Sequence, residues 1–466
     1  MRPTLVGAWL AVSAVTISAQ TGIEGTWQGS LSAGGATLRL QLNIKKDAKG
    51  ALTVTLDSLD QGAMGLRATE VSLKLGALHF NVPSVGGSYD GKLDEKGNGI
   101  NGTWSQGGFS APLDFERAGK PRTLPRPQEP TRPFPYDEQE ATFPNQAAGI
   151  TLAGTLTLPR GKGPFPAALL ISGSGPQDRD ESIMGHRPFL VLADRLTREG
   201  LAVLRFDDRG TGKSTGNFAV ATTLDFAADA EAGLAWLRTR AEIDPKRIGL
   251  IGHSEGANVA AIVASRAPAA FVVMMAPSGV RGEDLLVSQT AAIMNALGLP
   301  LDQVEKTLAF NKRAYAIARQ EKDAAVIERK LRSLLPELSG NQQIPKDMIE
   351  GQIKMLSSPW FRHFIDYDPV PAMKSVRSPV LAMFGEKDVQ VPADENLKAI
   401  RDALQSGGNK DFATIKLPGL NHLFQTAGTG LPMEYGQIEE TIAPTALDLI
   451  SKWLAERLKQ LVLPSP

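Results

Sequence analysis

A serine at the centre of the stretch Gly252–Gly256, which fits the pattern Gly-x-Ser-x-Gly, is the residue best placed for covalent chemistry. The apolar run Arg247–Ile251 before it predicts a short strand, and Ala257–Ala264 after it predicts a helix. So tight a strand-to-helix turn strains the backbone of its serine and exposes the hydroxyl. Glycines are needed beside it because side chains there would collide across the turn. We therefore expect Ser254 to be a nucleophile.

A serine hydroxyl is a weak nucleophile and needs a general base, usually a histidine. The chain has five histidines, and His253 is too close to Ser254 in the chain to turn back on it. The predicted β region, the segment before an early helix and a helical insertion hold three more, His79, His186 and His363. His422 follows the last predicted strand, and a residue there can reach the carboxyl edge of the sheet, where ligands bind. We expect His422 to be the base.

The carboxylate that orients the base should follow a strand between Ser254 and His422 in the chain. Asp388 comes directly after the predicted strand Val380–Phe384, and we expect it to be this acid. Glu386, two residues earlier, is the alternative.

The negative oxygen that forms when serine attacks a carbonyl needs backbone N–H donors placed in advance. The N–H of Glu255, at the predicted helix start, is one expected donor. The second should come from the small-residue loop Ser172–Pro176, which follows a predicted buried strand. We favour Ser174, with Gly173 and Gly175 as alternatives.

The chain is too long for one ordinary domain, and its patterning changes along its length. The chain has a charged residue, Arg2, near its start, followed by an apolar run from Leu5 to Ile17 and then by the small residues Ser18 and Ala19. This order predicts a secretory signal peptide cut after Ala19, and therefore a periplasmic or secreted protein. The expected parts are a signal peptide at 1–19, an antiparallel β domain at 20–117, a proline-rich linker at 118–135, and an α/β domain at 136–466 with a helical lid at about 279–378.

The two main domains differ in the period of their apolar residues. In the first, Leu38, Leu40, Leu42 and Ile44 alternate with polar residues, and about eight such strands at hairpin spacing predict a small barrel or sandwich. In the second, strands alternate with helices, which predicts a doubly wound, mostly parallel sheet. The β domain could capture a ligand, pair two chains into a homodimer or simply pack.

Composition bounds the partners and cofactors. Lys+Arg and Asp+Glu both number 50, so net charge offers no reason to expect nucleic acid or an anionic membrane as a partner. Past the signal, no segment reads as membrane-spanning. The absence of cysteine excludes thiol catalysis and thiolate metal ligands, and no histidine spacing suits a metal. Asp208–Ser214 is not a phosphate loop because Asp207 stands where that motif needs glycine. We expect neither cofactor nor metal.

Taken together, these residues resemble the α/β-hydrolase superfamily, specifically bacterial serine esterases close to the prolyl oligopeptidase and acyl-thioesterase branches. The order Ser254, Asp388, His422 is the one expected there. The matching motifs extend over roughly 137–460 and are Ser172–Asp178, Asp208–Gly212, Gly252–Gly256, Gly385–Asp388 and Gly419–His422. Similar esterases carry an N-terminal β domain and a cap with Pro-Trp-Phe-Arg. Ser358–Arg362 resembles that cap motif, so the resemblance implies that Trp360 and Phe361 line the acyl pocket.

The leading hypothesis is a secreted serine hydrolase that cleaves small carboxylic esters through an acyl-enzyme. A peptidase or acyl-peptide hydrolase and an acyl-thioesterase are the alternatives within enzymes. Peptidases of this kind usually need a carboxylate clamp for a substrate amine or a large β-propeller gate, and the sequence shows neither. An alternative of another class is a non-catalytic secreted protein that binds a lipid or glycan.

Overall fold

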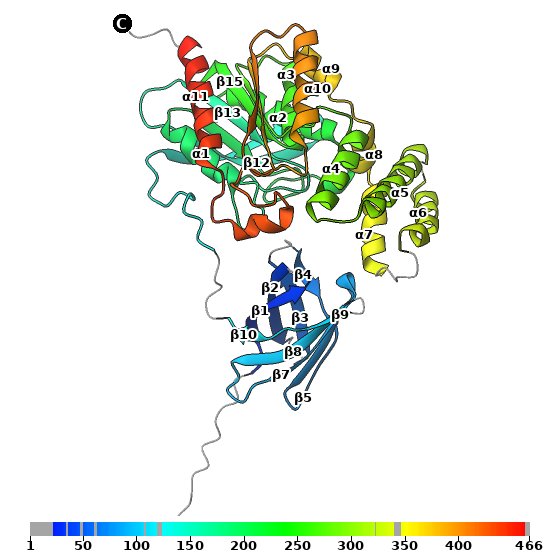
Figure 1. Ribbon diagram of the computed structural model, residues 1–466. Helices are drawn as coiled ribbons and strands as arrows, with labels where there is room; N and C mark the ends of the chain where they lie inside the picture. The colour runs from blue at the N-terminus through cyan, green and yellow to red at the C-terminus, as the bar shows by residue number, and fades with distance from the viewer. Residues whose placement is uncertain are drawn as a thin grey trace, which may run out of the picture. The chain divides into compact units, whose positions relative to one another are not determined.

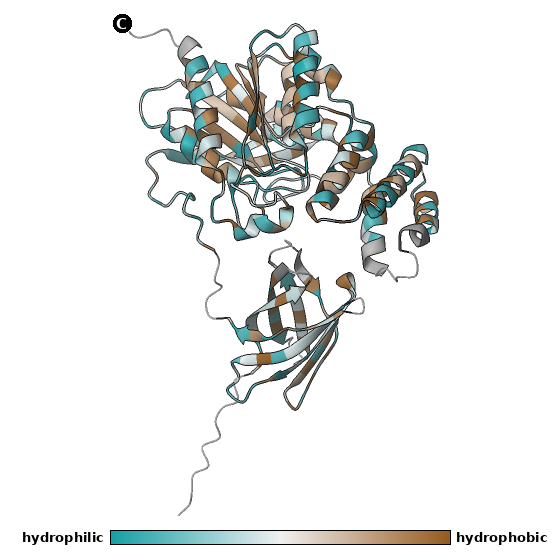
Figure 2. Ribbon diagram, in the orientation of Figure 1, coloured by the Kyte–Doolittle hydropathy of each residue, from teal (hydrophilic) through white to brown (hydrophobic). Residues whose placement is uncertain are grey.

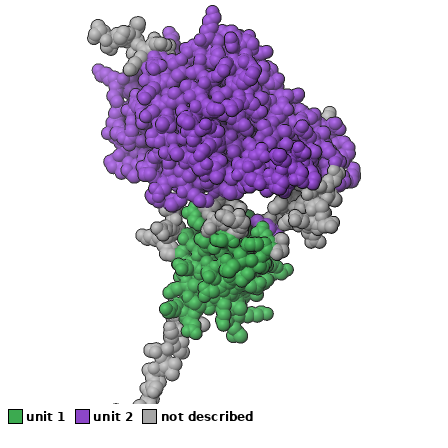
Figure 3. All heavy atoms as spheres, viewed as in Figure 1, with its two compact units in different colours: residues 1–57, 65–82, 87–120 green, residues 58–64, 83–86, 121–466 purple. Residues whose placement is uncertain are grey.

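The computed structural model describes residues 22–33, 36–46, 50–59, 63–106, 109–118, 124–321, 323–339 and 346–461. The predicted signal peptide at 1–19 lies outside these ranges. The chain forms two compact units, one of residues 1–57, 65–82 and 87–120 and the other of 58–64, 83–86 and 121–466 (Figure 3).

The smaller unit is one curved antiparallel sheet. Its strands are β1 (Gly25–Ala33), β2 (Ala36–Lys46), β3 (Leu52–Ser58), β4 (Ala63–Arg67), β5 (Thr69–Lys74), β6 (Ala77–Val82), β7 (Gly87–Leu93), β8 (Gly99–Gln106), β9 (Phe109–Pro112) and β10 (Phe115–Arg117). Their order is β4-β3-β2-β1-β10-β8-β7-β6-β5, with β9 paired to β8. Because β1 pairs with β10, the first and last strands meet within a barrel-like sheet (Figure 1). Its inward side chains, among them Trp27, Tyr89 and Phe115, are fully buried.

The larger unit is built on a mixed sheet of eight strands. These are β11 (Asp137–Asn145), β12 (Ile150–Leu158), β13 (Phe165–Ile171), β14 (Ala202–Phe206), β15 (Ile243–His253), β16 (Val272–Met275), β17 (Val380–Gly385) and β18 (Phe412–Leu417). Their order is β11-β12-β14-β13-β15-β16-β17-β18. The run from β14 to β18 is parallel, whereas β12 is antiparallel to both its neighbours. The predicted mostly parallel sheet is confirmed.

Helices cover the sheet in two layers, and both layers follow from apolar faces that need burial. Helices α1 (Pro188–Arg198) and α11 (Pro444–Leu461) pack together, and α2 (Thr223–Arg238), α3 (Glu255–Arg266), α9 (Val370–Ser375) and α10 (Ala393–Ser406) form a second connected layer (Figure 1). Short 3₁₀ turns occur at Pro83–Val85, Phe218–Val220 and Pro432–Gln437. In Figure 2 the strands between the layers are mainly hydrophobic, while much of α10 is hydrophilic.

The predicted helical insertion is also confirmed. Between β16 and β17, before α9, the chain forms α4 (Gly282–Ala296), α5 (Leu301–Gln320), α6 (Ala324–Ser339), α7 (Lys346–Ser357) and α8 (Pro359–Asp366). This cap has a small core of its own around Tyr315 and Ile365. No helix in the described part of the chain has the length and apolarity needed to cross a membrane.

The proline-rich segment leading into the larger unit is anchored on it. Arg126 donates hydrogen bonds to the backbone carbonyls of Gly436 and Ile438. The side-chain oxygen of Gln128 accepts from Thr441 N at 2.6 Å, and its nitrogen donates to Ile442 O at 2.6 Å. The predicted segment is therefore tied by side chains to the loop before α11.

Candidate active site

Ser254 lies on a sharp turn between β15 and α3. Its φ is 54° and its ψ is −122°, a conformation that side-chain-bearing residues rarely adopt. A Cβ on Gly252 would lie 2.1 Å from the carbonyl oxygen of Gly256, and one on Gly256 would lie 2.1 Å from that of Ile171. The two glycines therefore permit the turn that holds the serine above the sheet.

His422 and Asp388 lie together, as the sequence predicted. The His422 Nδ1–H donates to Asp388 Oδ2 at 2.7 Å. Asp388 Oδ1 accepts from the backbone N–H groups of Gln390 and Val391, both at 2.8 Å. Because Nδ1 carries the donated proton, Nε2 is left as the basic nitrogen. Glu386, the alternative acid, is exposed and accepts from Gly419 N instead.

Ser254 and His422 line the same pocket, a cavity of about 220 Å³. Its apolar wall comes from the cap and neighbouring loops: Ile183, Leu285, Leu286, Trp360, Phe364, Val391 and Leu423. The polar lining includes Gly173, Ser174 and Glu255. The expected nucleophile, base and oxyanion donors thus line one pocket.

The structure narrows the choice of backbone N–H groups that could bind the oxyanion. Glu255 is the first residue of α3, whose first N–H groups have no acceptor within the helix. The Gly173 N–H, in contrast, donates to Glu181 Oε1 at 2.7 Å, so it is committed elsewhere. Gly173, one of the predicted alternatives for the second donor, is therefore rejected, because its N–H is already bound to a carboxylate. Ser174 and Gly175 remain as candidates for the second donor.

The buried side chain of Asp208 holds the loop that carries Ser174 by hydrogen bonds. Asp208 accepts from Ser172 Oγ at 2.9 Å and from Gln177 N at 2.9 Å. Burial raises the pKa of Asp208 to about 8, while these hydrogen bonds act in the opposite direction. The loop that carries the candidate donors is thus held at both ends.

The side chain of Glu255 connects the turn that carries Ser254 to helix α8 of the cap. It is fully buried and accepts from Thr223 Oγ1 at 2.6 Å and from Trp360 Nε1 at 2.9 and 3.0 Å. Burial raises its pKa, and hydrogen bonds from Thr223, Trp360 and Ser174 oppose that rise. Helix α8 of the cap therefore contacts the turn that carries Ser254 through the Trp360–Glu255 hydrogen bonds.

Of the two residues that the resemblance placed in the acyl pocket, only Trp360 lines it. Phe361 is 2% exposed and packs in the cap core, with its ring centroid 5.5 Å from that of Tyr315. The prediction for Phe361 is wrong because residues one apart on a helix face different ways. Phe364, four residues after Trp360, shares its face of α8, stacks on it at 5.1 Å and lines the pocket.

Sequence reasoning missed two residues of the site, Glu181 and His253. His253 was treated as filler in the serine motif, yet it is 5% exposed, and both its ring nitrogens are hydrogen-bonded. Glu181 lies in the loop after the candidate oxyanion donors and faces His253. An acidic residue in a run of loop charges carries no signal that separates it from solvated neighbours. His186 and His363 do not line the pocket, and His79 belongs to the smaller unit.

The family of the chain follows from comparison with known proteins. The sequence model of the X-Pro dipeptidyl-peptidase (S15) family matches residues 148–408, more than half of the chain. The chain belongs to this family. The match covers β12 to α10, and with them Ser254 and Asp388. This S15 member is thus an α/β-fold hydrolase.

Relatives of this S15 member include an esterase. It is 26% identical to esterase EstD of Thermotoga maritima over 360 residues, which are 76% of this chain and 78% of that protein. Among solved structures, an esterase of Pyrococcus furiosus is 17% identical with a TM-score of 0.43, covering 73% of this chain and 98% of that one. Est1E of Butyrivibrio proteoclasticus, solved with ferulic acid, is 16% identical with a TM-score of 0.40, covering 70% and 100%.

Proposed function

We propose that this hydrolase cleaves small carboxylic esters through an acyl-enzyme. The observation that carries the proposal is the 2.7 Å hydrogen bond between His422 and the buried Asp388, because His422 lines the same pocket as Ser254. A strained serine, a basic imidazole nitrogen and an orienting carboxylate are the parts that acyl transfer requires.

In the proposed reaction Ser254 Oγ attacks the ester carbonyl carbon while His422 Nε2 takes the hydroxyl proton. The tetrahedral oxyanion accepts hydrogen bonds from the N–H groups of Glu255 and Ser174, each worth about 2.7–4 kcal/mol in the transition state. His422 then returns the proton to the leaving alkoxide, and the acyl group stays on Ser254. Water, deprotonated by His422, attacks the acyl-enzyme and releases the acid.

The pocket favours short acyl groups. Its volume of about 220 Å³ is below the range of about 300–1,000 Å³ found for drug-sized ligands. Leu285, Leu286 and Phe364 give it an apolar wall suited to an alkyl chain. We therefore propose acetyl to butyryl esters as the best substrates.

The charges in the pocket support an ester rather than a peptide with a free amine. Two carboxylates line the pocket, although the sequence revealed no carboxylate clamp. Glu181 faces His253, and Glu255 accepts hydrogen bonds from Thr223 and Trp360. Glu255 is already engaged, so an ammonium group would have to displace its donors. Glu181 is held through Oε1 by Gly173 N and by His253, while its Oε2 has no hydrogen-bond partner among the described residues. A dipeptidyl-peptidase, which the family name favours, is the second candidate.

The test compares p-nitrophenyl esters with peptide p-nitroanilides, which have similar leaving groups. We expect p-nitrophenyl acetate and butyrate to be cleaved and aminoacyl-proline p-nitroanilides not to be, and the reverse pattern would reassign the enzyme. Butyryl thioesters, assayed alongside, separate an esterase from an acyl-thioesterase. A fluorophosphonate probe should label the wild type and not Ser254→Ala. Absence of labelling in both would instead favour a non-catalytic binding protein.

We also propose that the protein is exported and cut after Ala19, as its first residues suggest. The test is intact mass and N-terminal sequencing of protein from a periplasmic extract. A mature chain starting at Gln20 supports export, and a chain that retains Met1 in the cytoplasm contradicts it.

A further inference from the structure

Glu181 has a backbone conformation that points to a specific task. Its φ is 53°, in the left-handed region that residues with side chains avoid. It is also 3% exposed, although it lies in a polar loop between β13 and α1. Strain of this kind persists only where the surrounding structure enforces it, and it concentrates at functional sites.

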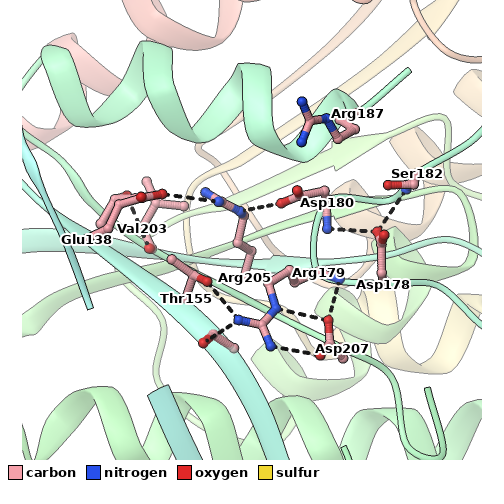
Figure 4. Close-up of polar contacts among 12 residues, drawn as sticks. Glu138, Thr155, Asp178, Arg179, Asp180, Ser182, Arg187, Val203, Arg205 and Asp207 are labelled. Atoms are coloured by element: carbon pink, nitrogen blue, oxygen red, sulfur yellow. Dashed lines mark hydrogen bonds and ion pairs between the residues drawn. The ribbon is translucent and has the colours of Figure 1, made fainter. Parts of the chain in front are cut away.

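Ion pairs clamp the residues before Glu181. Arg179 binds both carboxylate oxygens of Asp207, at 3.0 and 2.8 Å, and Arg205 donates to Asp180 at 2.7 Å. Figure 4 shows these two pairs next to each other, each joining a residue of the loop to the end of β14. Asp178 Oδ1 accepts from the N–H groups of Asp180 and Ser182, both at 3.0 Å. The loop is therefore fixed on both sides of the strained residue.

The carboxylate that this clamp presents connects two loops of the candidate site. Glu181 Oε1 accepts from Gly173 N at 2.7 Å and from His253 Nδ1 at 2.9 Å. On its other side, His253 Nε2 donates to the backbone carbonyl of His422 at 3.0 Å. An unbroken series of hydrogen bonds thus runs from the candidate oxyanion loop to the loop of the base.

We propose that Glu181 and His253 form a buried positioning ion pair that holds the oxyanion loop and the His422 loop in register beneath Ser254. Neither residue takes part in bond making. Their role is to keep Gly173, which precedes Ser174, at a constant distance from the backbone of His422.

The surroundings of His253 support a charged imidazole. Both ring nitrogens face oxygen acceptors, which only the doubly protonated ring can satisfy. Burial opposes the charge, but the attraction of Glu181, its hydrogen bond, the His422 carbonyl and the charge of Asp388 together raise the pKa of His253. The His422 ring lies 4.8 Å away and Phe424 6.4 Å away, measured between centroids.

The first test is independent of catalysis. In full-length protein with ¹⁵N-labelled histidine, we expect one histidine to keep both ring N–H protons at pH 7.5, where an ordinary histidine is mostly neutral. His253→Gln should remove that signal, and Glu181→Gln should turn it into a neutral ring, because the partner anion is gone. A neutral His253 in the wild type, or no change in Glu181→Gln, would overturn the ion pair.

The kinetic test, which rests on the proposed function, uses a double-mutant cycle. Each of Glu181→Gln and His253→Gln should lower kcat on p-nitrophenyl acetate by about 10²-fold with little change in KM, since misplacement of catalytic groups of about 1 Å costs that much. The double variant should lose about 10²-fold rather than 10⁴-fold, because the two act as one unit. Independent, multiplying losses would contradict the pair.

Matched controls separate this inference from misfolding and from a wrong function. Glu231→Gln and His79→Gln replace residues that have surface polar partners and do not line the pocket, and both variants should keep full activity. If a variant at 181 or 253 unfolds, the NMR signal of the wild type still decides the protonation of His253. If the wild type hydrolyses no ester yet shows the charged imidazole, the proposed function fails and the ion pair stands.

Discussion

Trp360, on the cap helix α8, donates its indole N–H to both carboxylate oxygens of Glu255, the residue after Ser254. The contact places a cap side chain one residue from Ser254, the candidate nucleophile. The backbone N–H of Glu255 is a candidate oxyanion donor. A movement of the cap at Trp360 would therefore shift the residue that carries this donor. This contact leads to the first prediction.

Trp360→Phe should lower kcat/KM on p-nitrophenyl butyrate by about 10-fold, because a hydrogen bond to a carboxylate contributes about 1.5–3 kcal/mol. The phenyl ring can still stack on Phe364, so the loss reports mainly the missing N–H. Trp453→Phe on α11 is the matched control, since its indole nitrogen has no hydrogen-bond partner among the described residues. Equal activity of both variants would show that the Glu255 contact is dispensable.

Asp388→Asn should lower kcat by about 10⁴-fold while leaving the fold intact, because the amide no longer selects the tautomer with a basic Nε2. Steady-state kinetics and a thermal melt check the two parts of this statement. Glu386→Gln is the control, since its amide oxygen can still accept from Gly419 N and activity should change little. A larger loss in Glu386→Gln than in Asp388→Asn would reverse the assignment.

Gly252→Ala should destabilise the protein by about 3 kcal/mol or more, since the new Cβ would lie 2.1 Å from a backbone oxygen that cannot move aside. Urea unfolding measures the change. Gly351→Ala, in helix α7, meets nothing within 4 Å and should be neutral or stabilising by up to about 1 kcal/mol. Similar stabilities for the two variants would mean that the turn relaxes easily.

Asp208 should make stability depend on pH. Its pKa is about 8 in the folded chain, because of burial, against 3.8 for the free side chain. Between those values the unfolded chain has released a proton that the folded chain keeps, so this group lowers the free energy of unfolding as pH rises from about 4 to 8.

The check is urea unfolding at pH 5.5, 7 and 8. Asp208→Asn should flatten the decline by up to about 1.4 kcal/mol per pH unit, whereas the exposed Asp302→Asn should leave it unchanged. An unchanged decline in Asp208→Asn would show that the aspartate is ionised in the folded chain throughout this range.

The sequence predicted the parts of the site that depend on order along the chain. Ser254 lies between a strand and a helix as expected, and Asp388, which follows a strand, contacts His422. These positions arise because parallel strands deliver the residues that follow them to a common edge.

What the sequence did not predict depends on side-chain direction and long-range packing. Phe361 and Phe364 differ only in which face of α8 they occupy. Glu181 is separated from His253 by 72 residues, and its importance comes from a left-handed φ that no residue type announces. The edge strand β11 pairs antiparallel with β12, a pairing fixed by its partner rather than by its own pattern.

The positive φ of Ser254 means that the fold itself does not favour a side chain at that place. Glycine, which tolerates this conformation, would relax the turn and abolish the hydroxyl together. Laboratory evolution for heat tolerance alone, without an activity screen, would therefore drift toward a more stable but inactive chain, and position 254 is one place where that drift would gain stability.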